Sequence, residues 1–386
     1  MDMYPSKQYI RFFRDSRPSL DESVCVPAEK WQTEVGLDCN DIHEIDMEAS
    51  LRWGKSGIGY WGRGRSAIAT TSLRLLGMGG WRGAWEISNN LASNGSEQEE
   101  AVVLKMLKWD KKLDFVKETY HRHQIDAAIA GRLSSSPRVI DIYAFCGQST
   151  LNEFASTSLL HEVKNLNKKD IPFFYNSTNK NWWPTLNRRI QYGRDAAHAV
   201  HELHSVDDHT GGLGPYNITI VHKDIKPDNF ALANGVMKLN DFNDAELARY
   251  NTTLSNGDDG SGDPCRFRRD RFDPHYPSPE EALERPLTPA VDVHALGGVL
   301  YFILVGRKPF SNLNESVAFA YLTHGVLPHV PNEVWDRGGW AVEEILELAR
   351  KCRSLNPSDR PKTKEVVAKI DHIYKRYNTE FGETKR

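Results

Sequence analysis

The feature that most constrains the fold of this chain is a change of hydrophobic pattern near residue 156. Between residues 71 and 155, short apolar and β-branched runs alternate with glycine-rich or polar turns, which predicts strands, and the stretch 114–133 predicts one helix. Between residues 156 and 377, apolar residues recur mainly at helical spacing. The pattern predicts an α+β fold of two lobes, a small β-rich lobe and a larger helical lobe, with a ligand-binding cleft between them.

The two ends of the chain fall outside these lobes. Residues 1–70 show weak periodicity and are predicted to form an irregular N-terminal extension, and residues 378–386 are predicted to form a short tail. The remainder of the 386 residues suffices for two lobes that each bury a sizeable core.

Charge and apolar patterning argue against two classes of partner. The net charge of -3 gives no electrostatic support for a nucleic-acid partner. The longest apolar run, residues 293–305, is too short to cross a bilayer and predicts a buried helix. We therefore expect a monomer with no nucleic-acid partner and no membrane span in this chain.

The cysteines and the glycosylation sequons point to different compartments. The 5 cysteines are widely spaced, odd in number and free of CxxC pairs, which predicts reduced thiols and neither a zinc site nor a disulfide framework. With no signal-peptide core near the N-terminus, we expect a cytoplasmic location. Sequons of the type Asn-x-Ser/Thr favour the alternative, the lumen of the secretory pathway. They begin at Asn94, Asn176, Asn217, Asn251 and Asn314.

Two short motifs carry the chemistry. The stretch 222–229, HKDIKPDN, lies between two short apolar runs and therefore on a loop. The sequence DFN at 241–243 follows a predicted strand a short distance later. The first motif resembles the catalytic loop of the eukaryotic protein kinases of the serine/threonine type, and the second resembles their metal-binding DFG.

The resemblance implies a role for each polar residue of these motifs. Asp224 would accept the proton of the substrate hydroxyl, and Lys226 would steady the γ-phosphate of ATP. Asn229 and Asp241 would hold Mg²⁺. The implied activity is the transfer of a phosphoryl group from ATP to a protein substrate, with Mg²⁺ as cofactor.

Further residues match the part of the family that binds ATP. Lys105, in AVVLK, resembles the lysine on the third strand that contacts the α- and β-phosphates. Gly77 and Gly79 resemble the first two glycines of the glycine-rich loop, Arg82 stands in place of the third, and Ala84 replaces the valine that covers the adenine. The backbone N–H groups of the turn would contact the nucleotide.

Two residues are candidates for the helical acid that pairs with Lys105. The run SSPRVIDIY resembles the family's HPNIVKLY, and counting back from it leads to Asp126. Glu118, two turns earlier, is the alternative. Aspartate is one methylene shorter than glutamate, so an ion pair with Asp126 requires a closer helix.

The connector between the lobes is expected at residues 152–155, NEFA. There the backbone of Glu153 and Ala155 would bind adenine, and Asn152 would take the gatekeeper position. Further along, Ser278-Pro279-Glu280 resembles the motif APE and Asp292 resembles a buried aspartate of the family. Arg360 resembles the late arginine that pairs with the APE glutamate, which predicts a buried Glu280–Arg360 pair of structural importance.

Three departures from the family pattern stand out. Lys223 replaces the arginine of HRD and loses its bidentate fork. Asn243 replaces the glycine of DFG. The segment 241–280 is long, and we hypothesise that a residue within it is phosphorylated and pairs with the arginines of 265–271, a disordered loop being the alternative. The candidates for that phosphorylation are Thr252, Thr253 and Ser255.

These residues together predict an ATP-dependent kinase that phosphorylates serine or threonine in proteins. Arg82, Asp126, Lys223 and Asn243 depart from the pattern and leave a second interpretation open, a pseudokinase that binds ATP or acts as a scaffold. A third interpretation is a kinase that acts on a small molecule or a glycan, although Lys226 favours a protein substrate.

Overall fold

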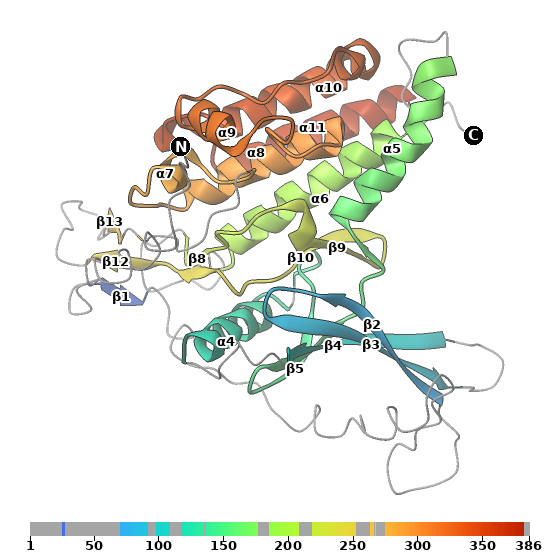
Figure 1. Cartoon of the computed structure of the whole chain (residues 1–386), viewed down its shortest axis with the longest axis vertical. Coiled ribbons are helices and arrows are strands. Elements are labelled where there is room, and N and C mark those ends of the chain that lie inside the picture. Colours follow the sequence, from blue (N-terminus) through green and yellow to red (C-terminus); the bar gives the residue numbers. More distant parts are fainter. Residues whose placement is uncertain are drawn as a thin grey trace, which may run out of the picture.

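The computed structural model describes residues 25–27, 70–91, 98–108, 117–134, 136–176, 185–207, 218–251, 263–265, 267 and 275–381. A β-sheet with one helix forms one part of the molecule and a bundle of helices forms the other, with short strands at the junction between them (Figure 1). The predicted α+β fold, a β-rich region followed by a mostly helical one, is therefore confirmed.

The sheet consists of five antiparallel strands in the order β2-β3-β4-β6-β5. Their bounds are β2 (Thr70–Met78), β3 (Arg82–Leu91), β4 (Gln98–Leu107), β5 (Ile142–Cys146) and β6 (Ser149–Glu153). A tight turn joins β2 to β3, closed by the N–H of Gly79, which donates to the carbonyl of Arg82 at 2.9 Å. In the register of β3 and β4, Ala84 lies opposite Lys105. The turn therefore leads directly into the strand pair that carries the predicted phosphate ligands.

Helix α4 (Lys117–Arg132) packs beside β5 of this sheet. Its apolar side, which includes Ala127 and Ile129, is fully buried. The prediction placed the start of this helix at residue 114, which lies outside the described residues. Because α4 lies between the sheet and the helical region, it can present a polar residue to both (Figure 1).

The helical region is built around α8 (Ala290–Val305). Every residue of α8 from Val291 to Leu304 is buried, which confirms the predicted buried helix. Gly306 ends the helix with a left-handed φ of 76°, a conformation that glycine adopts without strain. The surrounding helices are α5 (Leu159–Asn176), α6 (Leu186–His204), α7 (Pro279–Ala282), α9 (Glu315–Thr323), α10 (Asn332–Cys352) and α11 (Thr363–Phe381).

Short strands lie where the sheet meets the helices (Figure 1). Strand β9 (Phe230–Ala233) pairs with β10 (Val236–Leu239) and with β7 (Thr157–Ser158), while β8 (Ile220–Val221) pairs with β11 (Glu246–Leu247). Asn234 and Gly235, both left-handed, form the turn between β9 and β10. The loop between β8 and β9 is thereby held at both ends, and it contains the predicted catalytic residues.

A third small sheet departs from the prediction for the N-terminal extension. Strand β1 (Cys25–Pro27) pairs with β12 (Arg249–Asn251), which also pairs with β13 (Asp263–Pro264). Residues 25–27 are therefore regular structure rather than part of an irregular segment. Their pairing partner lies more than 200 residues away, so the local sequence pattern could not indicate it.

The prediction of reduced thiols was wrong for two cysteines. Cys146 and Cys265 are disulfide-bonded. Cys352 is a free thiol in the core, and burial raises its pKa to about 12. Spacing along the sequence misled the prediction, because distance along the chain does not report distance in the fold. Across the described residues, no helix combines the length and apolarity needed to cross a membrane.

Candidate active site

The centre of the site is the loop between β8 and β9, where three predicted residues meet. The carboxylate of Asp224 accepts a hydrogen bond from Nζ of Lys226 at 2.7 Å and another from Nδ2 of Asn229 at 2.9 Å. Nδ2 of Asn229 also donates to the backbone carbonyl of Asp224 at 2.8 Å. The side chain of Asp224 is 13% exposed, so it is fixed in orientation and still open to an incoming group.

Asp292 of α8 fixes the backbone of this loop. Its carboxylate accepts hydrogen bonds from the backbone N–H of His222 at 2.7 Å and of Lys223 at 2.9 Å. His204 of α6 contacts it at 3.0 Å through Nε2. Burial raises the pKa of Asp292, but the hydrogen bond and charge of His204 outweigh burial and hold the pKa below its usual value. Asp292 is therefore an anion in the core that holds the strained loop, in which Lys223 has a φ of 63°.

Lys223, which replaces the family's arginine, already has an acidic partner. Its Nζ donates to Oε2 of Glu246 at 2.8 Å and lies 5.5 Å from the centre of the Phe267 ring. Glu246 belongs to β11, at the start of the segment that was predicted to carry a phosphate. The three candidate phosphorylation sites, residues 252, 253 and 255, lie outside the described residues.

The DFN segment presents Asp241 to the site and buries the next side chain. Asp241 has a left-handed φ of 66°, while Phe242 is 1% exposed and packs against the ring of His222 at 5.2 Å between centres. Asn243 is not among the left-handed residues, and its Nδ2 donates to Oδ1 of Asp241. The asparagine at the position of the family's glycine therefore serves to orient the aspartate.

The expected ion pair between Lys105 and Asp126 is not formed. Nζ of Lys105 donates to Oδ1 of Asn240 at 2.8 Å, and Asp126 pairs with Arg82. Nη2 of Arg82 contacts Oδ2 of Asp126 and Oδ1 of Asn243, the latter at 3.2 Å. Both carboxylate oxygens of Asp126 are occupied by other donors, Oδ2 by Arg82 and Oδ1 by the backbone N–H of Phe242. The side chain of the alternative acid at position 118 lies outside the described residues.

Asp126 has a second role, because its Oδ1 accepts the backbone N–H of Phe242 at 2.8 Å. Burial lowers the pKa of Lys105 and outweighs the charge of Asp126, which acts in the opposite direction, and the charge of Arg82 lowers the pKa further. Burial raises the pKa of Asp126, but Arg82 and Lys105 outweigh burial and hold it below its usual value. Burial also raises the pKa of Asp241, and the charge of Asp126 adds to the effect. The site thus gathers two cations and two carboxylates in a small volume.

The predicted magnesium ligands fit a hard cation. Nδ2 of Asn229 is used by Asp224, so Oδ1 of Asn229 remains available as a ligand. Asp241 is buried close to other carboxylates, and a divalent cation would offset that repulsion. Oxygen donors of this kind are those that Mg²⁺ prefers.

The glycine turn is open to a ligand at its tip. A Cβ added to Gly77 would meet nothing within 4 Å, and one added to Gly79 would meet only the carbonyl oxygen of Arg82, at 3.3 Å. Ala84 is half-buried and, from its register opposite Lys105, lies on the same face of the sheet. These three predicted residues therefore lie along the same edge of the site as Lys105.

At the connector, the structure assigns the side chain of Glu153 to packing between the two regions. It forms a buried ion pair with Lys238 at 2.8 Å and accepts from Nδ2 of Asn234 at 2.9 Å. The backbone N–H of Glu153 donates to the backbone carbonyl of Asp141 at 3.0 Å. Asn152 is buried, and Ala155 is half-buried after the end of β6.

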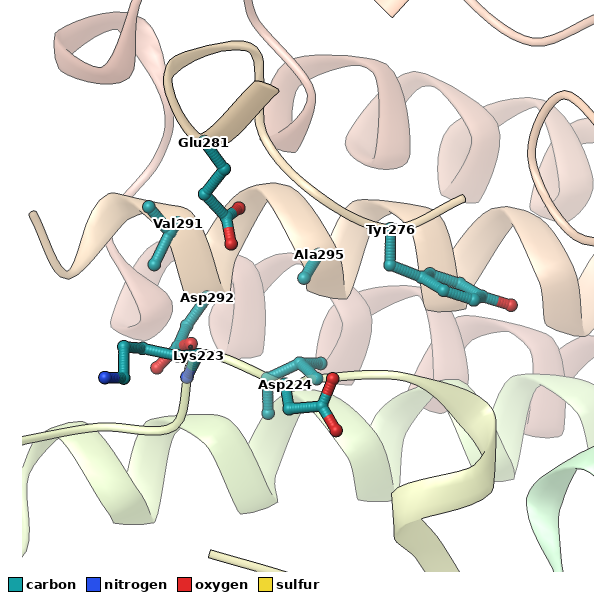
Figure 2. A pocket seen from close by; sticks show the side chains of 8 residues that line it. Lys223, Asp224, Tyr276, Glu281, Val291, Asp292 and Ala295 are labelled. Carbon is teal, nitrogen blue, oxygen red and sulfur yellow. Dashed lines mark hydrogen bonds between the residues drawn. The ribbon is translucent and has the colours of Figure 1, made fainter. Parts of the chain in front are cut away.

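A small pocket lies beside Asp224, between the loop 222–229 and helices α7 and α8 (Figure 2). Glu281, which caps α7 by accepting from the N–H of Ser278 at 2.7 Å, adds an acid to its wall. Next to Glu281 in the sequence, Glu280 forms the predicted ion pair with Arg360. Arg360 donates to both carboxylate oxygens of Glu280, at 2.6 and 2.7 Å. The pocket is lined by Lys223, Asp224, Ile225, Tyr276, Glu281, Val291, Asp292 and Ala295.

Sequence reasoning missed four residues that shape the site: Arg82 as an ion-pair partner, Asn240 on Lys105, Glu246 on Lys223, and Lys238 on Glu153. Asn240 directly precedes DFN, and its position next to this motif is a signal that could have indicated a place in the site. All four contacts join residues far apart in sequence, and no local pattern signals them.

The fold and this cleft define a protein with the framework of a phosphoryl-transfer enzyme. Residues 91–370 match the family model described as "Protein kinase domain". The chain therefore belongs to the protein kinase family. The match begins after the glycine turn, so the turn itself depends on the geometry above.

Individual relatives are distant and longer than this chain. The dual specificity protein kinase shkC of Dictyostelium discoideum is 27% identical over 188 residues, which cover 48% of this chain and 32% of that protein. The serine/threonine-protein kinase drp72 of Corynebacterium efficiens is 36% identical over 121 residues, covering 31% and 21%. The dual specificity protein kinase Ttk of Danio rerio is 26% identical over 190 residues, covering 48% and 17%. The aligned regions thus span a third or less of each relative.

Proposed function

We propose that this chain is an ATP-dependent protein kinase that phosphorylates serine or threonine hydroxyls. The observation that carries the proposal is the arrangement of Asp224, Lys226 and Asn229, in which one carboxylate is held by two neighbouring donors and remains open to solvent. Membership of the protein kinase family implies ATP and Mg²⁺ as the ligands of the cleft.

In the proposed reaction, the hydroxyl oxygen of the substrate attacks the γ-phosphorus and the bond to the β-phosphate oxygen breaks, releasing ADP. Asp224 accepts the hydroxyl proton, and Lys226, 2.7 Å from the same carboxylate, lies where it can stabilise the charge of the transferred group. Asn229 and Asp241 would hold Mg²⁺, which supplies charge neutralisation on the phosphates. The pocket beside Asp224 is a candidate site for the substrate residue.

One observation favours a second candidate function, an ATP-binding scaffold without transfer activity. Asp126 pairs with Arg82 rather than with Lys105, so the expected ion pair between Asp126 and the lysine does not form. The intact Asp224, Asn229 and Asp241 favour the enzyme. An acceptor other than a protein, such as a small molecule or glycan, is a further alternative for the same chemistry.

The test measures transfer of labelled phosphate from Mg-ATP to a generic basic protein and to the chain itself, in wild type beside Asp224→Asn. We expect label in the wild type, its loss in the variant, and recovery of the label as phosphoserine or phosphothreonine after hydrolysis. Nucleotide binding without label in either protein would favour the scaffold. Label found on phosphotyrosine alone would contradict the proposed acceptor.

We also propose that the chain resides in an oxidising compartment, the lumen of the secretory pathway. The disulfide-bonded Cys146 and Cys265 support this location, together with the 5 sequons. A mobility shift after endoglycosidase treatment of the protein from its native host would support this location, and its absence together with free thiols would count against it.

A further inference from the structure

Arg82 is a buried charged group of the cleft that the family pattern does not explain. It begins β3 directly after the glycine turn, at the position of a glycine in the resembled family. Its side chain is only 5% exposed, although arginine usually keeps its guanidinium in water. Such burial calls for partners on each nitrogen.

Only part of the guanidinium is satisfied. Nη2 contacts both Asp126 and Asn243, while Nη1 is buried and has no hydrogen-bond partner among the described residues. A buried, charged donor without an acceptor is costly, and a binding site is one of the settings in which such a group persists. The unused Nη1 therefore indicates an acceptor that comes from outside the chain.

The register of the sheet places this donor beside Lys105. Residues 82 and 84 are two apart on β3 and share one face, and Ala84 lies opposite Lys105 on β4. The open tip of the glycine turn borders the same face. The free donor, the lysine and the turn therefore surround one space.

The charges in this space favour an anion. Lys105 donates to the neutral Asn240, and among the described residues no carboxylate forms an ion pair with it. Asp126 is neutralised by Arg82 itself. The second carboxylate near these cations is Asp241, and the proposed function assigns it to the metal.

We propose that Arg82 is a nucleotide-binding residue that holds Asp126 with Nη2 and donates Nη1 to a non-transferred phosphate of a nucleoside di- or triphosphate. Arg82 would share the phosphates with Lys105, and through Asp126 and Asn243 it links them to α4 and to the DFN segment. This inference rests on the proposed function only in taking the cleft to bind a nucleotide. The opposite possibility, an arginine that blocks the cleft, predicts the reverse effect on affinity.

The test measures dissociation constants by isothermal titration calorimetry for Mg-ATP, Mg-ADP and adenosine on the full chain. Arg82→Met keeps the apolar stem and removes the donors. We expect weaker binding of ATP and ADP by about ten- to a hundredfold, the range for a hydrogen bond between charged groups, with adenosine unchanged because it has no phosphate. The matched control is Arg74→Met, an exposed arginine of the same sheet, which should change none of the three constants.

Equal weakening of ATP and adenosine by Arg82→Met would show a structural role and overturn the proposal, as would tighter ATP binding, the sign of a blocking residue. Arg82→Lys serves if the methionine variant does not fold, and it should weaken ATP by a smaller factor, again sparing adenosine. Failure of the wild-type chain to bind ATP would overturn the proposed function before any variant is compared. Binding without phosphoryl transfer would overturn the enzyme and leave the assignment of Arg82 intact.

Discussion

Replacing Arg360 with methionine should destabilise the protein far more than the same replacement of a surface arginine. Arg360 donates two hydrogen bonds to Glu280 and others to the carbonyls of Ser354 and Ala290, at 3.0 and 2.9 Å. The two charged side chains are 1% and 7% exposed. Methionine retains the stem but leaves the glutamate buried without its cation, which costs about 3–5 kcal/mol.

The assay is urea denaturation followed by tryptophan fluorescence and, to test for a single transition, by circular dichroism. With a denaturant slope of about 3 kcal/mol/M for a chain of this size, the midpoint should fall by about 1–1.7 M. The matched control is Arg350→Met, whose partner Glu347 is exposed, and it should shift the midpoint by less than about 0.2 M. Adding Glu280→Leu to Arg360→Met should restore part of the loss, because the stranded carboxylate is gone. Equal midpoints for the two single variants would refute the reasoning.

Two further predictions concern the core. Gly297→Ala would place a Cβ 2.8 Å from the carbonyl oxygen of Ala349, and this crowding of α8 against α10 should cost about 1–3 kcal/mol in urea denaturation, whereas Gly80→Ala, with nothing within 4 Å, should cost less than about 1 kcal/mol. Burial lowers the pKa of His123 to about 4, from 6.5 for a histidine exposed to water, so the unfolded chain takes up this proton first as the pH falls below 6.5. The stability that depends on a neutral His123 is therefore fully present above pH 6.5 and is lost as the pH falls towards 4. When the pH is lowered from 7 to 5, the free energy of unfolding of His123→Gln should fall by about 1–2 kcal/mol less than that of the wild type. An equal fall for the two proteins would contradict this reasoning.

The parts of the site that could be predicted are those encoded within a few residues. Asp224, Lys226 and Asn229 are brought together because a short turn between two strands fixes their mutual positions, and the motif alone specifies that turn. The Glu280–Arg360 pair was also predicted, although 80 residues separate its members, because both belong to motifs of the family. Resemblance here supplied what local pattern could not.

The contacts that were not predicted depend on packing between distant segments. Arg82 takes the partner expected for Lys105, and the remaining oxygen of Asp126 accepts the backbone N–H of Phe242. Cys146 and Cys265 were predicted to be reduced thiols because the spacing of cysteines along the chain does not show which of them lie close to another cysteine in the fold. Both errors concern distances that exist only after folding.

Asp292 has a consequence for how motion would be divided within the molecule. It joins the loop of Asp224 to α8, a helix whose residues are buried almost throughout, by two backbone hydrogen bonds. Lys105 and Arg82 are carried instead by the sheet. A hinge movement between the two regions would therefore shift these two cations, which we propose to contact the phosphates, while Asp224, the proposed proton acceptor, stays fixed to the helical region. The position of the sheet relative to the helical region would then determine how Lys105 and Arg82 align with Asp224.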